Sequence, residues 1–221
     1  MTPVPFTTFI AIVGGSGSGK SWLGERLARD LGPGALSFSL DEFYRDQSRG
    51  PSEEPDFFNY DLPSAIEWSL FKKAMRDCEK QNSFRLPQYD FTHHRRSERE
   101  KHCDPPSIAI VDGLWLLHRP DIRRMFDLTM FLDCPEDLRM HRRIERDVAE
   151  RGRTLQASWH GFHETVNAMH RVYVAPQKSY VDHIVDCPFG EAQVASLRKS
   201  ILTARLSDSY EPSPPLHVTR S

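Results

Sequence analysis

Eight consecutive residues near the N-terminus match the phosphate-binding pattern G-x-x-x-x-G-K-[ST]. They are Gly14, Gly15, Ser16, Gly17, Ser18, Gly19, Lys20 and Ser21. Glycines let the backbone curl so that its N–H groups point at phosphate oxygens, and a following helix adds its positive end. Lys20 would reach the β- and γ-phosphates of a nucleotide, and the Ser21 hydroxyl would bind Mg²⁺. A glycine-rich turn without a ligand is the alternative, but the complete pattern between an apolar run and a helix favours a nucleotide site.

Two carboxylates follow apolar runs and could complete such a site. Asp41 comes after the run 35–40, and Asp112 comes after the run 108–111. In open α/β sheets, functional groups collect at the carboxyl ends of strands. At such a position Asp41 could accept the proton of an attacking hydroxyl, and Asp112 could bind Mg²⁺ together with Ser21. A role as a turn or cap residue is the alternative interpretation of both.

A third feature is the arginine-rich segment 138–153. Its arginines are Arg139, Arg142, Arg143, Arg146, Arg151 and Arg153. By their spacing, the first, third and fourth of these share one face of a helix. A salt-bridged surface helix is the ordinary interpretation of such a pattern. Here the arginines lead into Arg-Gly-Arg at 151–153, which favours a glycine-hinged lid that brings guanidinium groups onto a phosphoryl group.

Apolar runs and helical periodicity predict the elements that would hold these residues. Strands are expected at 6–13, 35–40, 108–111, 128–132 and 183–186, with a further extended segment at 84–90. Helices are expected at 20–31, 63–80, 135–150, 162–175 and 191–206. The charge-dense segment 93–101 is predicted to be a solvated loop. Strands that alternate with helices indicate βαβ units, and hence an α/β fold with a parallel sheet and helices on both faces.

The composition argues against several classes of protein. The chain has 221 residues, with 29 Lys and Arg against 31 Asp and Glu, and a net charge of −2 disfavours a main role in binding duplex nucleic acid. The apolar run 108–117 is too short for a membrane helix and is interrupted by Asp112. The N-terminus lacks the charged start of a signal peptide, and the four cysteines show no C-x-x-C spacing. We therefore expect a cytoplasmic protein with reduced thiols and with no membrane or nucleic-acid partner.

A phosphate-binding loop indicates a nucleotide but does not specify a reaction. A GTPase would need an N-K-x-D motif, which the sequence lacks, and a large mechanical ATPase would need a longer chain. A compact kinase remains, and it requires an acceptor pocket, a base and a closing lid.

Taken together, the motifs resemble the uridine kinases (uridine–cytidine kinases) of the phosphoribulokinase/uridine kinase group of P-loop kinases. The resemblance extends over residues 8–186 and rests on GGSGSGKS, DEFYRD, NYDLPSA, LPQYDFTHHRR, IVDGLWLL, RRIERDVAERGR and KSYVDHIVD in that order. The chain departs from the usual pattern at Trp22, which replaces a small hydroxyl residue, at Glu42, which replaces Ser or Thr, and at Asp112, which replaces Glu. The segment 154–161 does not align with the family.

The resemblance implies transfer of the γ-phosphoryl group of ATP or GTP, with Mg²⁺, to the 5′-hydroxyl of uridine or cytidine. It makes Asp41 the general base and assigns the charge developing in transfer to Lys20, Arg146 and Arg151. Around the nucleoside it places Asp61, Tyr89, His94, Arg143 and Arg153, with Tyr44 and Phe91 as walls of the pocket. It places Asp182 near the base or ribose of the phosphoryl donor.

The resemblance also implies a three-layer P-loop fold with an arginine-rich lid and a five-stranded parallel sheet whose central strand carries the phosphate loop. We expect one kinase domain over 1–206, with an acceptor-binding excursion at 44–105, a lid at 139–165 and a disordered tail at 207–221. Members of the family are often oligomeric, so a homo-oligomer is compatible with the sequence. Two alternatives stay open: a kinase of the same group that acts on a sugar or small alcohol, and a nucleotide-sensing or nucleic-acid-associated ATPase.

Overall fold

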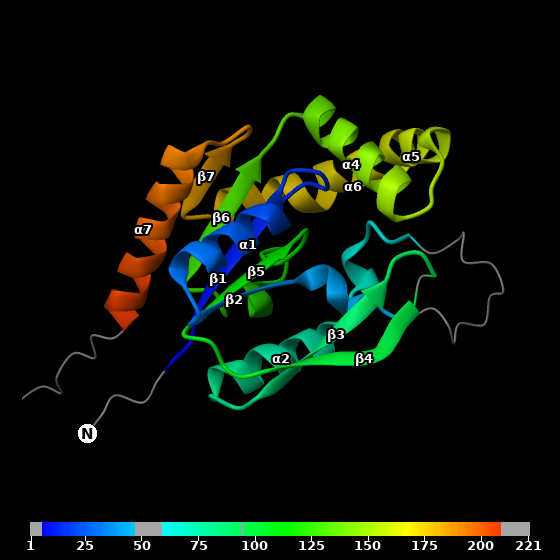
Figure 1. Cartoon of the computed structure of the whole chain (residues 1–221). Coiled ribbons are helices and arrows are strands. Elements are labelled where there is room, and N and C mark those ends of the chain that lie inside the picture. Colours follow the sequence, from blue (N-terminus) through cyan, green and yellow to red (C-terminus); the bar gives the residue numbers. More distant parts are fainter. Residues whose placement is uncertain (1–5, 47–58, 94, 209–221) are drawn as a thin grey trace, which may run out of the picture.

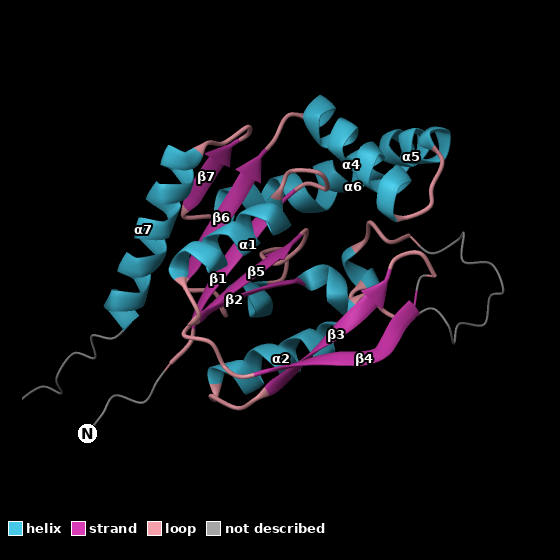
Figure 2. Ribbon diagram, in the orientation of Figure 1, coloured by secondary structure: helices cyan, strands magenta, loops and turns pink. Residues whose placement is uncertain are grey.

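The computed structural model describes residues 6–46, 59–93 and 95–208, which form a parallel sheet between two layers of helices (Figures 1 and 2). The sheet has five strands in the order β2-β5-β1-β6-β7. Their bounds are β1 Thr8–Gly14, β2 Ala35–Ser39, β5 Ile108–Gly113, β6 Leu128–Asp133 and β7 His183–Asp186. The expected parallel sheet is confirmed, and the strand that leads into the phosphate loop is its central strand.

Helices cover both faces of this sheet. Their bounds are α1 Lys20–Leu31, α2 Trp68–Glu79, α3 Pro120–Arg123, α4 Glu136–Glu150, α5 Leu155–Gly161, α6 Asn167–Met169 and α7 Glu191–Asp208. Short 3₁₀ turns occur at η1 Leu40–Phe43, η3 Pro63–Ala65 and η6 Ala175–Tyr180. Two π-helical turns occur at η4 Phe162–Val166 and η5 His170–Val174. From α5 to η6 these turns follow one another without a break, so the helix expected at 162–175 is longer than predicted.

The core explains why β1 and β5 have the sequences TFIAIVG and IAIVDG. Both strands are buried along their whole length, which requires continuous apolar runs rather than alternating ones. Alternate residues of β1 join two core clusters, one shared with α2 and the other shared with α1 and α7. Two-sided burial therefore fixes the carboxyl ends of the two strands, where the phosphate loop and Asp112 lie.

Two predictions of secondary structure need correction. The helix expected at 63–80 begins only at Trp68, because Ile66 has an extended backbone. The solvated loop expected at 93–101 is wrong: β4, Arg95–Cys103, pairs antiparallel with β3, Phe84–Asp90, in a separate two-stranded sheet. β3 turns its apolar side chains into the core, whereas the side chains of β4 mostly face solvent. An antiparallel pair of strands with one face in water tolerates many charged side chains. The hydrophobicity pattern of the sequence therefore does not identify β4 as a strand.

The ends of the chain complete the comparison with the sequence. α7 extends to Asp208, two residues beyond the predicted end, and residues 209–221 of the expected tail lie outside the described residues. The limits of the domain, the excursion and the lid stay predictions. All four cysteines are free thiols. Within the described ranges, no helix combines the length and the hydropathy that crossing a bilayer requires.

Candidate active site

The phosphate loop connects the central strand to α1. Gly17 and Gly19 adopt positive φ angles of 81° and 94°, which side-chain-bearing residues rarely adopt. The ammonium group of Lys20 is buried and donates to the Gly15 carbonyl oxygen over 3.0 Å. Burial lowers the pKa of Lys20, and the charge of Asp112 opposes that shift. The loop thus has the curled conformation that the glycine spacing predicts.

α4 packs directly on this loop. A Cβ atom added at Gly17 would lie 2.2 Å from the carbonyl oxygen of Arg139, so only glycine allows so close an approach. The neighbouring Gly15 faces the side chains of Arg139 and His170. Burial lowers the pKa of His170 to about 4, with the charges of Arg139 and Lys20 acting in the same direction. The imidazole is therefore neutral at pH 7, so His170 adds no positive charge to that of the neighbouring Arg139.

Asp112 lies at the end of β5 beside the phosphate loop. Its Oδ1 accepts hydrogen bonds from the Ser21 hydroxyl over 3.0 Å and from the Ser39 hydroxyl over 3.2 Å. The side chain is 3% exposed, and burial raises its pKa to about 7 while Lys20 opposes the shift. Oxygen atoms from three side chains therefore converge at one point. Carboxylate and hydroxyl oxygens are the ligands that Mg²⁺ prefers, so this donor set fits a magnesium ion.

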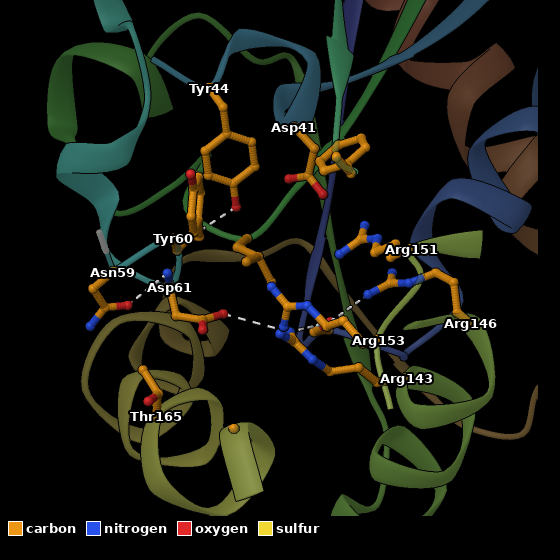
Figure 3. A pocket seen from close by; sticks show the side chains of 14 residues that line it. Asp41, Tyr44, Asn59, Tyr60, Asp61, Arg143, Arg146, Arg151, Arg153 and Thr165 are labelled. Atoms are coloured by element: carbon orange, nitrogen blue, oxygen red, sulfur yellow. Dashed lines mark hydrogen bonds and ion pairs between the residues drawn. The ribbon is translucent and has the colours of Figure 1, made fainter. Parts of the chain in front are cut away.

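A cavity of about 270 Å³ opens next to the loop (Figure 3). Nine residues that the sequence singled out line it: Ser16, Asp41, Tyr44, Asp61, Phe91, Arg143, Arg146, Arg151 and Arg153. A second cavity, of about 420 Å³, includes Ser21 and Asp112 and shares Asp41, Phe91, Arg146 and Arg151 with the first. Asp41 therefore lies on the border between the cavity beside the predicted metal ligands and the cavity with the aromatic wall.

The carboxylate of Asp41 is held at the start of η1. Its backbone N–H donates to the Ser39 hydroxyl, which caps the turn. Its Oδ1 is buried and has no hydrogen-bond partner among the described residues. Figure 3 shows the carboxylate facing the guanidinium groups of Arg146 and Arg151 across the cavity. A buried, unpartnered carboxylate oxygen at a cavity wall is an acceptor available to a ligand.

One wall of the cavity is aromatic. The ring of Tyr44 lies 5.8 Å from that of Tyr60 and 6.2 Å from that of Phe91, both in edge-to-face contact. The Tyr44 hydroxyl donates to the Tyr60 carbonyl oxygen over 3.0 Å, and burial raises its pKa. Tyr89 is buried behind this wall, 5.4 Å from the Tyr44 ring, and does not line the cavity. It supports the wall from the core instead of facing the space that a ligand would occupy.

The opposite wall is a cluster of four arginines around one carboxylate. Asp147 is fully buried, and its oxygens lie 3.3 to 3.9 Å from guanidinium nitrogens of Arg143, Arg146, Arg151 and Arg153. Arg143 also contacts Asp61 over 3.6 Å and donates to the Ser16 hydroxyl over 3.0 Å. The sequence analysis singled out the arginines and gave Asp147 no role in the site. The spacing of four residues from Asp147 to Arg143 and to Arg151 was a local signal that could have marked it.

Two further predicted residues remain, His94 and Asp182. His94 lies outside the described residues. The carboxylate of Asp182 accepts two hydrogen bonds from Thr129, at the start of β6. Thr129 pairs with Ala11, three residues before the phosphate loop and so about 10 Å away along the strand. The expectation that Asp182 lies near the base or ribose of the phosphoryl donor stays a prediction, and in the structure Asp182 ties the start of β6 to the segment before β7.

The cavity also contains residues that the sequence analysis missed. They are Asn59, Tyr60, Leu114, Gly161 and Thr165. Asn59 and Tyr60 precede Asp61 directly, so the motif NYDLPSA held a signal for them. Gly161 and Thr165 come from the helical turns after the arginines, in and beside the segment 154–161, which the sequence analysis could not align with the family, and no local signal marked them.

Comparison with known proteins gives consistent results. A model of the "Phosphoribulokinase / Uridine kinase family" matches residues 9–190. A uridine kinase of Ligilactobacillus salivarius is 37% identical over 187 residues, covering 84% of this chain and 87% of that protein. A uridine kinase of Halobacterium salinarum is 36% identical over 186 residues, covering 84% and 82%.

Solved structures share the fold at lower identity. A putative fructose transport system kinase from a Silicibacter species has a TM-score of 0.67 at 21% identity, covering 83% of this chain and 92% of that one. Phosphoribulokinase from Rhodobacter spheroides has a TM-score of 0.61 at 18% identity, covering 83% and 71%. At these identities the structures support the three-layer α/β architecture and no finer statement.

The close approach of α4 to the phosphate loop predicts the effect of Gly17→Ala. The substitution should lower the free energy of unfolding by about 2–4 kcal/mol, because it adds the cost of a positive φ to a clash with the Arg139 carbonyl. Urea denaturation measures this. Gly34→Ala is the matched control, since its Cβ would meet only Ser107 at 3.5 Å and its φ is not positive. Equal stability of the two variants would contradict the predicted strain.

The arginine cluster predicts a cost for Asp147→Asn. Removing the charge should lower the free energy of unfolding by about 3 kcal/mol, because four guanidinium groups lose their shared buried partner. Glu145→Gln serves as the control, since Glu145 lies on the same helix and pairs only with exposed His141, where the loss should stay below about 1 kcal/mol. A variant at 147 as stable as this control would show that the arginines do not depend on the carboxylate.

Proposed function

This chain belongs to the phosphoribulokinase/uridine kinase family, whose members transfer a phosphoryl group from a nucleoside triphosphate to a hydroxyl group, and we propose that it phosphorylates the 5′-hydroxyl of uridine or cytidine. The relatives named uridine kinase support this choice over most of both chains. The observation that carries it is the place of Asp41, which borders both the cavity of the predicted metal ligands and the cavity with the aromatic wall. An acceptor hydroxyl and a donor phosphate can meet only at such a border.

The donor in this proposal is ATP or GTP. Its phosphates would lie in the loop 14–21, with the Lys20 ammonium against the β- and γ-phosphates. Ser21 and Asp112 would hold Mg²⁺, which supplies positive charge to the donor phosphates when bound. The burial of Asp112 suits this role, because a cation stabilises a deprotonated carboxylate more strongly in a buried site than in water.

The acceptor would lie in the cavity of about 270 Å³, near the lower end of the range for small-molecule sites. The base would stack on the wall of Tyr44 and Phe91, because the edges and faces of aromatic rings favour such contacts. Asp61, held by Arg143, would accept hydrogen bonds from ribose hydroxyls. Arg153 would complete this rim, Tyr89 would support the wall from behind, and His94 keeps its predicted contact with the base.

In the proposed reaction, the 5′-oxygen attacks the γ-phosphorus in line, and the bond from that phosphorus to the β-phosphate oxygen breaks. The proton of the 5′-hydroxyl passes to the free Oδ1 of Asp41. Lys20, Arg146 and Arg151 stabilise the charge that spreads over the transferred oxygens. Because these arginines share Asp147, their guanidinium groups are oriented before the substrate arrives.

A sugar or small-alcohol kinase of the same group is the alternative. The aromatic wall favours a nucleoside, since a sugar alone offers no flat ring to stack on it. A nucleotide-sensing or nucleic-acid-associated ATPase is a weaker candidate, because the net charge of −2 offers little general attraction for a polyanion. The four free thiols support a reducing compartment such as the cytoplasm. A homo-oligomer stays a prediction.

A product assay tests this proposal. The protein is incubated with Mg²⁺ and ATP or GTP, together with a panel of nucleosides, sugars and small alcohols, and the products are identified by mass. We expect uridine or cytidine monophosphate. A phosphorylated sugar or alcohol in its place would support the alternative, and loss of ATP without a phosphorylated small molecule would support the ATPase.

Asp41→Asn tests the general base. Because the amide cannot accept the proton, kcat should fall by about 10²–10⁴-fold, while the Kd for the nucleoside stays within about threefold of wild type. Steady-state kinetics and calorimetry give the two quantities. Asp104→Asn is the control, since this carboxylate accepts a hydrogen bond from the Ser83 hydroxyl and lies outside both cavities. Turnover near wild type with binding intact would remove Asp41 from the mechanism.

A further inference from the structure

The Asp182 carboxylate is engaged by Thr129, so other side chains near the phosphate loop are candidates for contacting the base of the phosphoryl donor. The direction in which the donor extends can be derived from the loop. The acceptor cavity reaches the loop at Ser16, so the γ-phosphate must lie toward that end. The α-phosphate, ribose and base then extend past the other end of the loop, toward Gly19 and the first turn of α1.

Two side chains from distant parts of the sequence lie beside Gly19. A Cβ atom added there would be 3.8 Å from Nη1 of Arg142 and 3.9 Å from the ring of Phe189. Phe189 belongs to the segment after β7, and that segment is held against the loop because the Cys187 thiol donates to the Ser18 carbonyl oxygen over 3.6 Å. Arg142 comes from α4 and makes no ion pair with a carboxylate in the described part of the chain.

Trp22 completes this group from the first turn of α1. Its ring centroid lies 5.8 Å from that of Phe189 at an angle of 47°, and the side chain is 54% exposed. The ring therefore packs on one neighbour and leaves much of its surface to solvent. Exposure of a tryptophan so close to a phosphate loop contributes nothing to the core, whereas an aromatic surface there can hold a flat, apolar ligand group.

We propose that Trp22, Phe189 and Arg142 form the binding site for the base of the phosphoryl donor, with the base stacked on the Trp22 ring. The proposal rests on the proposed function in that the donor is a nucleoside triphosphate. Stacking on an aromatic ring accepts any base, and a guanidinium group beside the ring adds a cation–π contact or a hydrogen bond to a base carbonyl. Trp22, a departure from the usual family residue, is then the residue through which this chain holds its donor.

Two ligands separate a base site from the phosphate loop. Mg-ADP carries a base, whereas Mg-tripolyphosphate occupies the loop without one, and calorimetry gives the Kd of each. Trp22→Ala should weaken ADP binding by about 10-fold or more, in line with the loss of one stacked base, and should leave tripolyphosphate within about twofold of wild type. Trp22→Phe should recover most of the ADP affinity, because it restores an aromatic face. We also expect ADP to quench the tryptophan fluorescence of the wild type, and Trp22→Phe should lose that quenching.

Tyr180→Ala is the matched control, an equally exposed aromatic residue that contacts Arg123 instead of the loop. It should bind both ligands like wild type. Unchanged ADP affinity in Trp22→Ala would overturn the proposal, and so would an equal loss for both ligands, which would make Trp22 a support of the loop. Because the titration uses no acceptor, its outcome is independent of the product assay: a protein that binds ADP through Trp22 but forms no nucleoside monophosphate would refute only the proposed acceptor.

Discussion

The arrangement of the candidate site depends on one buried carboxylate among four guanidinium groups. Arg143, Arg146, Arg151 and Arg153 repel one another, and bringing them together near a phosphate loop is unfavourable without an opposite charge at close range. Asp147 supplies that charge from the interior of α4, with no exposed surface of its own. The four positive charges of the guanidinium groups exceed the single negative charge of Asp147, so the cluster keeps a net positive charge. The cluster is therefore stable enough to exist and still positive enough to attract a transferring phosphoryl group.

The other three acidic residues of the site lie in different environments. Asp112 is buried against two hydroxyl groups, and its pKa is raised to about 7, so a cation stabilises its charged form. Asp61 is paired with Arg143 at the rim of the acceptor cavity. Asp41 keeps one buried oxygen without a partner in the described residues, which leaves it available as a proton acceptor. The net charge of −2 for the whole chain therefore conceals a strongly polarised local arrangement, which a phosphoryl-transfer site requires.

The parts that were predictable from the sequence have local physical causes. β1 and β5 could be predicted as buried strands because burial on both faces of the sheet requires unbroken apolar runs. The phosphate loop could be predicted because its positive φ angles require glycine. The errors have causes of a different kind. β4 is held by backbone pairing with β3, so its exposed charges resemble those of a loop. The contact of Asp182 with Thr129 depends on which distant segment the fold brings beside it, and no periodicity within its own segment records that. The i,i+4 spacing of Asp147 from Arg143 and Arg151 is a local signal, but spacing alone does not distinguish a buried shared partner from an ordinary surface pair.

The contact between Gly17 and the Arg139 carbonyl bears on how far the predicted lid moves. The start of α4 lies against the phosphate loop so closely that a single methyl group would collide with it. One turn later, Arg143 already donates to the Ser16 hydroxyl of the same loop. The first turn of α4 is thus fixed against the phosphate loop, so we expect any movement of the predicted lid beyond it, near Gly152, whose φ of 65° suits a turn. We therefore expect the arginines nearest the loop to act by being oriented in advance, and only the later part of the segment to close over the acceptor as a lid.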